Sequence, residues 1–153
     1  MASEKPDWQI EAVDFSNEAV ELAQSNAINL DLQQVNIYQS DWFSAIDDNK
    51  KFDLIVSNPP YISESEWNGL EPEVREHEPR QALVGGKDGL CFYRQIIQEA
   101  ADWLMPDGYL IIETGETQAG TIIKLIQNEL YYEDTEIIKD LQVKERVISA
   151  KRK

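Results

Sequence analysis

The chain has 153 residues, of which 42% are hydrophobic and 28% charged, and this is enough apolar sequence for one compact domain with a sizeable core. Its formal charge of −15 repels phosphate backbones, so the composition counts against nonspecific nucleic-acid binding. No apolar run approaches membrane-spanning length, and the first residues lack the basic and apolar regions of a signal peptide. The single cysteine, Cys91, permits no internal disulfide and suits a reducing cytoplasm, where we expect the chain to be located.

Strand and helix patterns alternate along the first third of the chain. The pattern predicts a short strand over 10–14, then a helix that Ser16 caps and that ends near Asn29. Two further strands are predicted over 34–39 and 52–57.

The segment 62–88 is rich in Glu, Pro and Gly and has few periodic apolar positions, which predicts a long, partly ordered loop. Six of its glutamates could steer a basic protein partner, although a solvated charge run is the more common explanation of such a pattern. His77, the only histidine, lies among them without the further ligands that a metal site needs, so we expect no metal.

The C-terminal half returns to alternating elements. The pattern predicts a helix over 90–104, a turn over 105–108 and a strand over 109–113. A second helix follows over 118–128, and a closing antiparallel pair over 132–138 and 144–150. We therefore expect one domain over 1–153, an α/β fold with a doubly wound sheet and an antiparallel edge at the C-terminus. Cys91 is expected to be a small core residue of the first of these helices.

The candidate active site is the corner formed by Asn58, Pro59, Pro60 and Tyr61. It follows the apolar run 52–56 directly, and that run is typical of a buried parallel strand. Open α/β sheets bind ligands at the carboxyl ends of such strands, and two prolines make the corner stiff. An ordinary rigid turn is the simpler alternative.

These residues suit methylation of an amide nitrogen, which is a poor nucleophile because its lone pair is delocalised. The Asn58 side-chain carbonyl could accept one N–H, and the backbone carbonyl of Pro59 could accept the other. Tyr61 could stack on the flat group. Both acceptors would stabilise the positive charge that develops on nitrogen, so no strong general base is needed.

The Asn-Pro-Pro-Tyr motif and the residues around it resemble the HemK/PrmC family. The similarity runs over nearly the whole chain and includes segments 12–14, 40–43, 53–57, 78–83 and 108–113. That family consists of S-adenosylmethionine-dependent methyltransferases that modify, at N5, the glutamine of the Gly-Gly-Gln motif in peptide chain release factors. The resemblance implies a Rossmann-like class I methyltransferase fold, with a release factor as the partner.

The resemblance also implies a role for individual residues. Asp14 would accept hydrogen bonds from the ribose hydroxyls of S-adenosylmethionine, and Asp41 and Trp42 would lie beside its adenine. Asn58 to Tyr61 would hold the glutamine amide, with Asn58 also next to the cofactor. Glu78 lies in a segment that flanks the substrate site in the family, but the sequence assigns it no chemical role. Taken alone, Asp14 could instead be a helix-start acid and Trp42 a core residue.

The sequence departs from the family at its beginning. The family's glycine-rich cofactor loop and its N-terminal helical domain have no counterpart here, so the chain resembles a catalytic domain truncated at its N-terminus. Gly85, Gly86 and Gly89 do not replace that loop, because they follow no predicted strand. We expect S-adenosylmethionine to bind weakly or not at all. We also expect the strands ending at Asp14 and Ser57 to pair directly or to accept a strand from another chain.

Three functions remain open from the sequence. The first is release-factor glutamine methylation, and the second is adenine-N6 methylation of nucleic acid, which also uses an Asn-Pro-Pro-Tyr motif. The third is an inactive fragment that only folds or associates. The charge of −15 and the absence of a basic stripe count against the second.

Overall fold

The protein folds as two compact units. The computed structural model describes residues 1–153, and the units comprise Met1–Lys50 and Lys51–Lys153. None of the helices combines the length and the apolar character that crossing a lipid bilayer requires.

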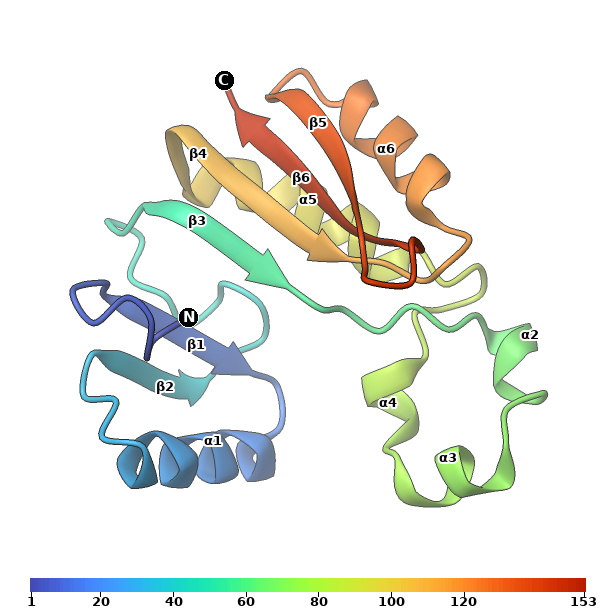
Figure 1. The fold of residues 1–153 in the computed structure, drawn as a ribbon, viewed down its shortest axis with the longest axis horizontal. Coiled ribbons are helices and arrows are strands. Elements are labelled where there is room, and N and C mark those ends of the chain that lie inside the picture. Colours follow the sequence, from blue (N-terminus) through green and yellow to red (C-terminus); the bar gives the residue numbers. More distant parts are fainter. The chain divides into compact units, whose positions relative to one another are not determined.

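The first unit is built on a parallel pair of strands with one helix (Figure 1). Strand β1 (Ile10–Asp14) pairs with β2 (Val35–Gln39) from Ile10 opposite Val35 to Asp14 opposite Gln39. Helix α1 (Asn17–Asn29) connects them and packs against both strands. The predicted cap is confirmed, because the Ser16 hydroxyl accepts a hydrogen bond from the backbone N–H of Ala19 at 3.3 Å.

The second unit is built on a four-stranded mixed sheet in the order β3-β4-β6-β5 (Figure 1). Its longer elements are β3 (Phe52–Ser57), α5 (Cys91–Trp103), β4 (Leu104–Glu113), α6 (Ala119–Asn128), β5 (Tyr132–Lys139) and β6 (Glu145–Arg152). Strands β3 and β4 are parallel, whereas β6 is antiparallel to both β4 and β5. The predicted α/β class and the antiparallel C-terminal strands are therefore confirmed.

The core of the second unit lies between the sheet and helices α5 and α6. Leu110 lies opposite Ala150 and Ile112 opposite Ile148, and all four side chains are fully buried. Helix α5 packs on β4, α6 packs on β5 and β6, and the two helices contact each other. The Tyr132 hydroxyl donates to the backbone carbonyl of Ile97 at 2.8 Å, which ties β5 to α5.

The structure differs from the sequence expectation along β3 and β4. Strand β3 is parallel to β4 as expected, but it is an edge strand of its sheet and Val56 is 52% exposed, so the expectation of a buried strand was wrong. Strand β4 begins at Leu104 and contains the predicted turn as an irregularity, since Leu104 pairs with Phe52 and Tyr109 with Leu54. Asp107, within this irregularity, has a φ of 65°.

The acidic segment is more ordered than the sequence predicts. It forms three short helices, α2 (Glu64–Trp67), α3 (Pro72–His77) and α4 (Arg80–Leu83). A capping box stabilises α2, in which Ser63 and Glu66 satisfy each other's backbone N–H groups. The expectation of a loop overlooked these short helices, of which α2 alone has a side-chain cap.

One further expectation was wrong. Cys91 is exposed at the first position of α5, because the buried face of that helix is formed by Tyr93, Ile96, Ile97, Ala100 and Ala101. The strands that end at Asp14 and Ser57 lie in separate sheets, β1-β2 and β3-β4-β6-β5, which leaves the other predicted alternative, that they accept a strand from another chain.

Candidate active site at the Asn-Pro-Pro-Tyr corner

The corner lies at the carboxyl ends of two adjacent parallel strands. Strand β3 ends at Ser57, which is in register with Ile112 of β4, and the corner begins at the next residue. Asn58 is exposed, Pro59 is buried, and Pro60 and Tyr61 are half-buried. The Asn58 side chain is thus accessible to a ligand, while the next residue, Pro59, is held in the protein interior.

The segment 83–86 runs beside the corner and holds it by backbone hydrogen bonds. The N–H of Ile62 donates to the carbonyl of Leu83 at 2.9 Å, and the N–H of Gly85 donates to the carbonyl of Ile62 at 2.8 Å. The N–H of Glu64 donates to the carbonyl of Gly86 at 3.1 Å. This short parallel bridge fixes the chain as it leaves the corner.

Two glycines of this region are required by the close approach of the backbone. A Cβ atom at Gly85 would lie 2.4 Å from the carbonyl oxygen of Pro60. One at Gly89 would lie 2.3 Å from the carbonyl oxygen of Tyr61, and Gly89 also has a φ of +71°. Neither glycine was predicted from the sequence to belong to the site. The signal was present, because three glycines within 85–89 indicate a segment that another backbone approaches closely.

Buried and paired groups hold the elements on either side of the corner. Tyr93 of α5 is fully buried, and its hydroxyl donates to the backbone carbonyl of Glu113 at 3.0 Å. Burial raises the pKa of Tyr93, which further favours the neutral phenol that donates this hydrogen bond. Asp88 accepts a hydrogen bond from the N–H of Leu90 at 3.1 Å and pairs with Arg94. The hydrogen bond from Arg94 is the main reason that the pKa of Asp88 falls to about 2.

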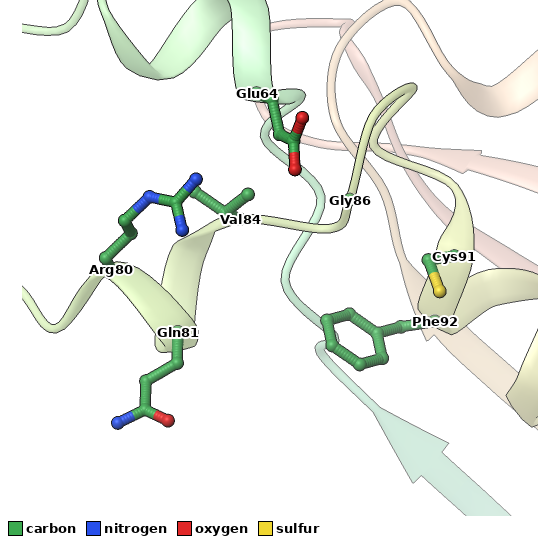
Figure 2. A pocket seen from close by; sticks show the side chains of 7 residues that line it. All are labelled: Glu64, Arg80, Gln81, Val84, Gly86, Cys91 and Phe92. Carbon is green, nitrogen blue, oxygen red and sulfur yellow. The ribbon is translucent and has the colours of Figure 1, made fainter.

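A cavity of about 510 Å³ lies next to this segment (Figure 2). It is lined by Glu64, Arg80, Gln81, Val84, Gly86, Cys91 and Phe92. Glu64 and Arg80 reach it from α2 and α4, and the ring of Phe92 lies across from them (Figure 2). The lining carries one carboxylate and one guanidinium and is otherwise neutral, so it has no excess of positive charge that would attract a polyanion.

The other predicted site residues lie together in the first unit, at the carboxyl ends of β1 and β2. Asp14 ends β1, and its backbone carbonyl accepts a hydrogen bond from the N–H of Ser40 at 3.0 Å. Asp41 and Trp42 follow Ser40 directly, and the Ser40 hydroxyl donates to the carbonyl of Trp42 at 2.8 Å. This bond supports a left-handed backbone at Trp42, whose φ is 52°.

These residues fit the adenosine part of a nucleoside cofactor. The exposed Asp14 carboxylate uses Oδ1 to accept the N–H of Ser16 at 2.7 Å, and its remaining lone pairs can accept two ribose hydroxyls. Asp41 is exposed and can accept hydrogen bonds, and the half-buried Trp42 offers part of a flat indole ring. Asn58 to Tyr61 belong to the second unit.

Comparison with known proteins assigns the family. A family model described as a methyltransferase domain matches residues 1–150. Release factor glutamine methyltransferase of Shewanella oneidensis is 43% identical over 152 residues, which are 99% of this chain and 52% of that protein. The enzyme of the same description from Bacillus anthracis is 37% identical over 151 residues, 98% of this chain and 53% of that protein. The chain thus spans about half the length of the curated relatives it matches.

Solved structures show the same fold at low sequence identity. A methyltransferase from Pyrococcus furiosus has a TM-score of 0.68 at 19% identity, and the match covers 99% of this chain and 68% of that one. TrmN from Thermus thermophilus has a TM-score of 0.60 at 16% identity, covering 94% and 36%. These likenesses confirm the Rossmann-like class I methyltransferase fold, and the curated relatives confirm the resemblance to HemK/PrmC enzymes. The chain belongs to the methyltransferase domain family and is similar over nearly its whole length to release factor glutamine methyltransferases.

Proposed function

We propose that this chain transfers a methyl group from S-adenosylmethionine to the side-chain amide nitrogen, N5, of a glutamine in a peptide chain release factor. The observation that carries the proposal is the exposed Asn58 on a corner with a buried Pro59 at the carboxyl end of β3. The similarity to enzymes described as release factor glutamine methyltransferases supports it.

The corner would orient the acceptor nitrogen. A primary amide has two N–H donors, which the Asn58 side-chain carbonyl and the Pro59 backbone carbonyl would accept. Tyr61 would cover one face of the planar group. The two carbonyl dipoles would also stabilise the charge that grows on nitrogen as its bond to the methyl group forms. The proton then lost from nitrogen can leave to water.

The donor would be contacted by the first unit's residues. Asp14 would accept hydrogen bonds from the ribose, and Asp41 and Trp42 would lie beside the adenine. S-adenosylmethionine supplies the electrophilic methyl group when it is bound. These three residues would not contact the methionine part of S-adenosylmethionine, so we expect the donor to bind weakly. Isothermal titration calorimetry would measure its dissociation constant. A dissociation constant in the micromolar range or tighter would contradict this expectation.

Adenine-N6 methylation makes the same demand on Asn58 and Pro59, so the proposal needs a test of substrate class. The formal charge of −15 and the mixed lining of the cavity support a protein acceptor. The reaction would take place in the cytoplasm, where the single cysteine remains reduced.

Self-association is a further proposal about partners. Strands β1 and β3 each lie at the edge of their own sheet, and edge strands offer unpaired backbone groups. A strand from another chain would satisfy them. Light scattering should then show a mass above that of the 153-residue chain, whereas a monomer over the whole concentration range would contradict the proposal.

Labelled-methyl transfer tests the proposed activity. Radiolabelled S-adenosylmethionine is incubated with the full chain and either a release factor or DNA. We expect label in the release factor, and we expect Asn58→Ala to abolish it. Asn128→Ala, at an exposed position at the end of α6, is the matched control and should retain wild-type transfer. Label in DNA alone, or in neither acceptor at saturating donor, would contradict the proposal.

A further inference from the structure

We propose that Gln118 is a positioning residue that fixes the backbone of the Asn-Pro-Pro-Tyr corner for its amide acceptor. The inference rests on the proposed function for its catalytic consequence, whereas its structural part stands on the contacts of Gln118 alone. Gln118 lies immediately before α6, about sixty residues after the corner in the sequence.

The Gln118 side-chain amide joins three backbone segments. Its Nε2 donates to the carbonyl of Tyr61 at 2.9 Å and lies 3.4 Å from the carbonyl oxygen of Gly89. Its Oε1 accepts the N–H of Gly115 at 3.2 Å. One side chain thus connects the corner at Tyr61, the turn before α5 at Gly89, and Gly115, which lies two residues after the end of β4.

Glycines surround this amide on two sides. A Cβ atom at Gly115 would lie 2.6 Å from Oε1 of Gln118 and 3.2 Å from Cδ2 of Tyr61. One at Gly89 would lie 2.8 Å from Nε2 of Gln118. Neither position has room for a Cβ atom, so the amide packs directly against both glycines.

The anchor of Gln118 is rigid. The next residue, Ala119, is 1% exposed, and Ile122, one turn into α6, is fully buried. The amide is therefore held from a helix that is fixed in the core of the second unit.

An amide is the chemical group that these partners require. The two carbonyls need a donor and the Gly115 N–H needs an acceptor, and a primary amide supplies both. A carboxylate of the same shape would direct an anionic oxygen at the carbonyl oxygens of Tyr61 and Gly89, and the donor would be lost.

The hydrogen bond to Tyr61 affects the reacting groups through the stiff backbone between them. It fixes the orientation of the peptide group after Tyr61. The two prolines before Tyr61 have ring-locked φ angles, so a shift at Tyr61 is transmitted to the Pro59 carbonyl and to Asn58 instead of being absorbed locally. Gln118 would thus place both acceptors of the substrate amide without contacting the substrate.

The test compares Gln118→Ala and Gln118→Glu with Gln127→Ala, an exposed glutamine on the same helix, in the full chain. The first measurement is amide hydrogen exchange of Ile62 and Glu64, whose N–H groups bond to segment 83–86. We expect both Gln118 variants to exchange these amides at least about tenfold faster, with exchange in the core strands β4 and β6 unchanged. Wild-type exchange at Ile62 and Glu64, or faster exchange throughout the second unit, would overturn the positioning role.

The second measurement is the kcat and KM of methyl transfer to release factor. A displacement of about 1 Å lowers kcat by about 100-fold, so we expect a loss of about 10-fold to 100-fold, with KM for the methyl donor within about twofold. Gln127→Ala should match the wild type. If the wild type transfers no methyl group but the Gln118 variants exchange the two amides faster, the proposed function is overturned and the structural role of Gln118 is supported. An unchanged kcat beside faster exchange would overturn the catalytic role of Gln118.

Discussion

Replacement of Gly89 by alanine is the sharpest test of how the corner is held. Gly89 has a φ of +71°, in the left-handed region where an L-residue costs about 1–2 kcal/mol. The added methyl group would lie 2.3 Å from the carbonyl oxygen of Tyr61 and 2.8 Å from Nε2 of Gln118. The nearer atom belongs to the backbone, so relief requires movement of the corner itself.

The magnitude follows from these two contributions. Overpacking of a tightly packed site costs about 1–3 kcal/mol, in addition to the backbone strain. We therefore expect Gly89→Ala to lower the free energy of unfolding by about 2–5 kcal/mol. This is a large part of the stability of an ordinary domain, which is about 5–15 kcal/mol.

Urea unfolding followed by circular dichroism measures this loss, and the chain offers a matched control. Gly120 lies within α6, and a Cβ atom there meets no other atom within 4 Å. Gly120→Ala should stabilise the protein by about 0.5–1 kcal/mol, because alanine favours the helix over glycine. A Gly89→Ala variant within about 0.5 kcal/mol of the wild type would refute the reasoning about the close approach.

Three further predictions concern the second unit. Thr114→Val should leave the free energy of unfolding unchanged or raise it by up to about 1 kcal/mol, because the buried Thr114 hydroxyl has no hydrogen-bond partner. A loss of more than about 1 kcal/mol in urea unfolding would contradict this. Ile122→Ala should lower it by about 2–5 kcal/mol, because Ile122 is fully buried, and a loss below about 1 kcal/mol would be inconsistent with that burial. The pKa of Asp88 lies below its ordinary value of 3.8, at about 2, so its stabilising contribution is complete above pH 4 and is lost as the pH falls towards 2. Acid unfolding should depend less on pH in this window for Asp88→Asn, and an identical profile would exclude that role.

The sequence predicted the groups that would contact the acceptor but not the groups that hold them. Asn58 and Tyr61 could be predicted as candidates because a short motif after a strand carries its chemistry in neighbouring residues. Gly89 and Gln118 approach Tyr61 from 28 and 57 positions away along the chain, respectively. Such an approach follows from tertiary packing, which composition and periodicity do not reveal.

The same distinction applies to the fold. Strands β1 and β3 and helix α1 were predicted because apolar periodicity and a serine cap are local signals. The exposure of Cys91 and of Val56 was missed because burial depends on which face of a helix, or which edge of a sheet, is covered. The three short helices of the acidic segment were missed because helices of four to six residues have too few positions to show a period.

The most direct test of the central claim is whether the corner binds a primary amide. An isotope-labelled sample of the full chain is titrated with a Gly-Gly-Gln peptide and, separately, with the same peptide carrying Glu in place of Gln. We expect the glutamine peptide to shift the NMR signals of the Asn58 side-chain amide and of the Ile62 backbone amide. The glutamate peptide should not shift them, because its carboxylate lacks both N–H donors. Equal shifts with the two peptides, or no shift with the glutamine peptide at millimolar concentration, would contradict the claim.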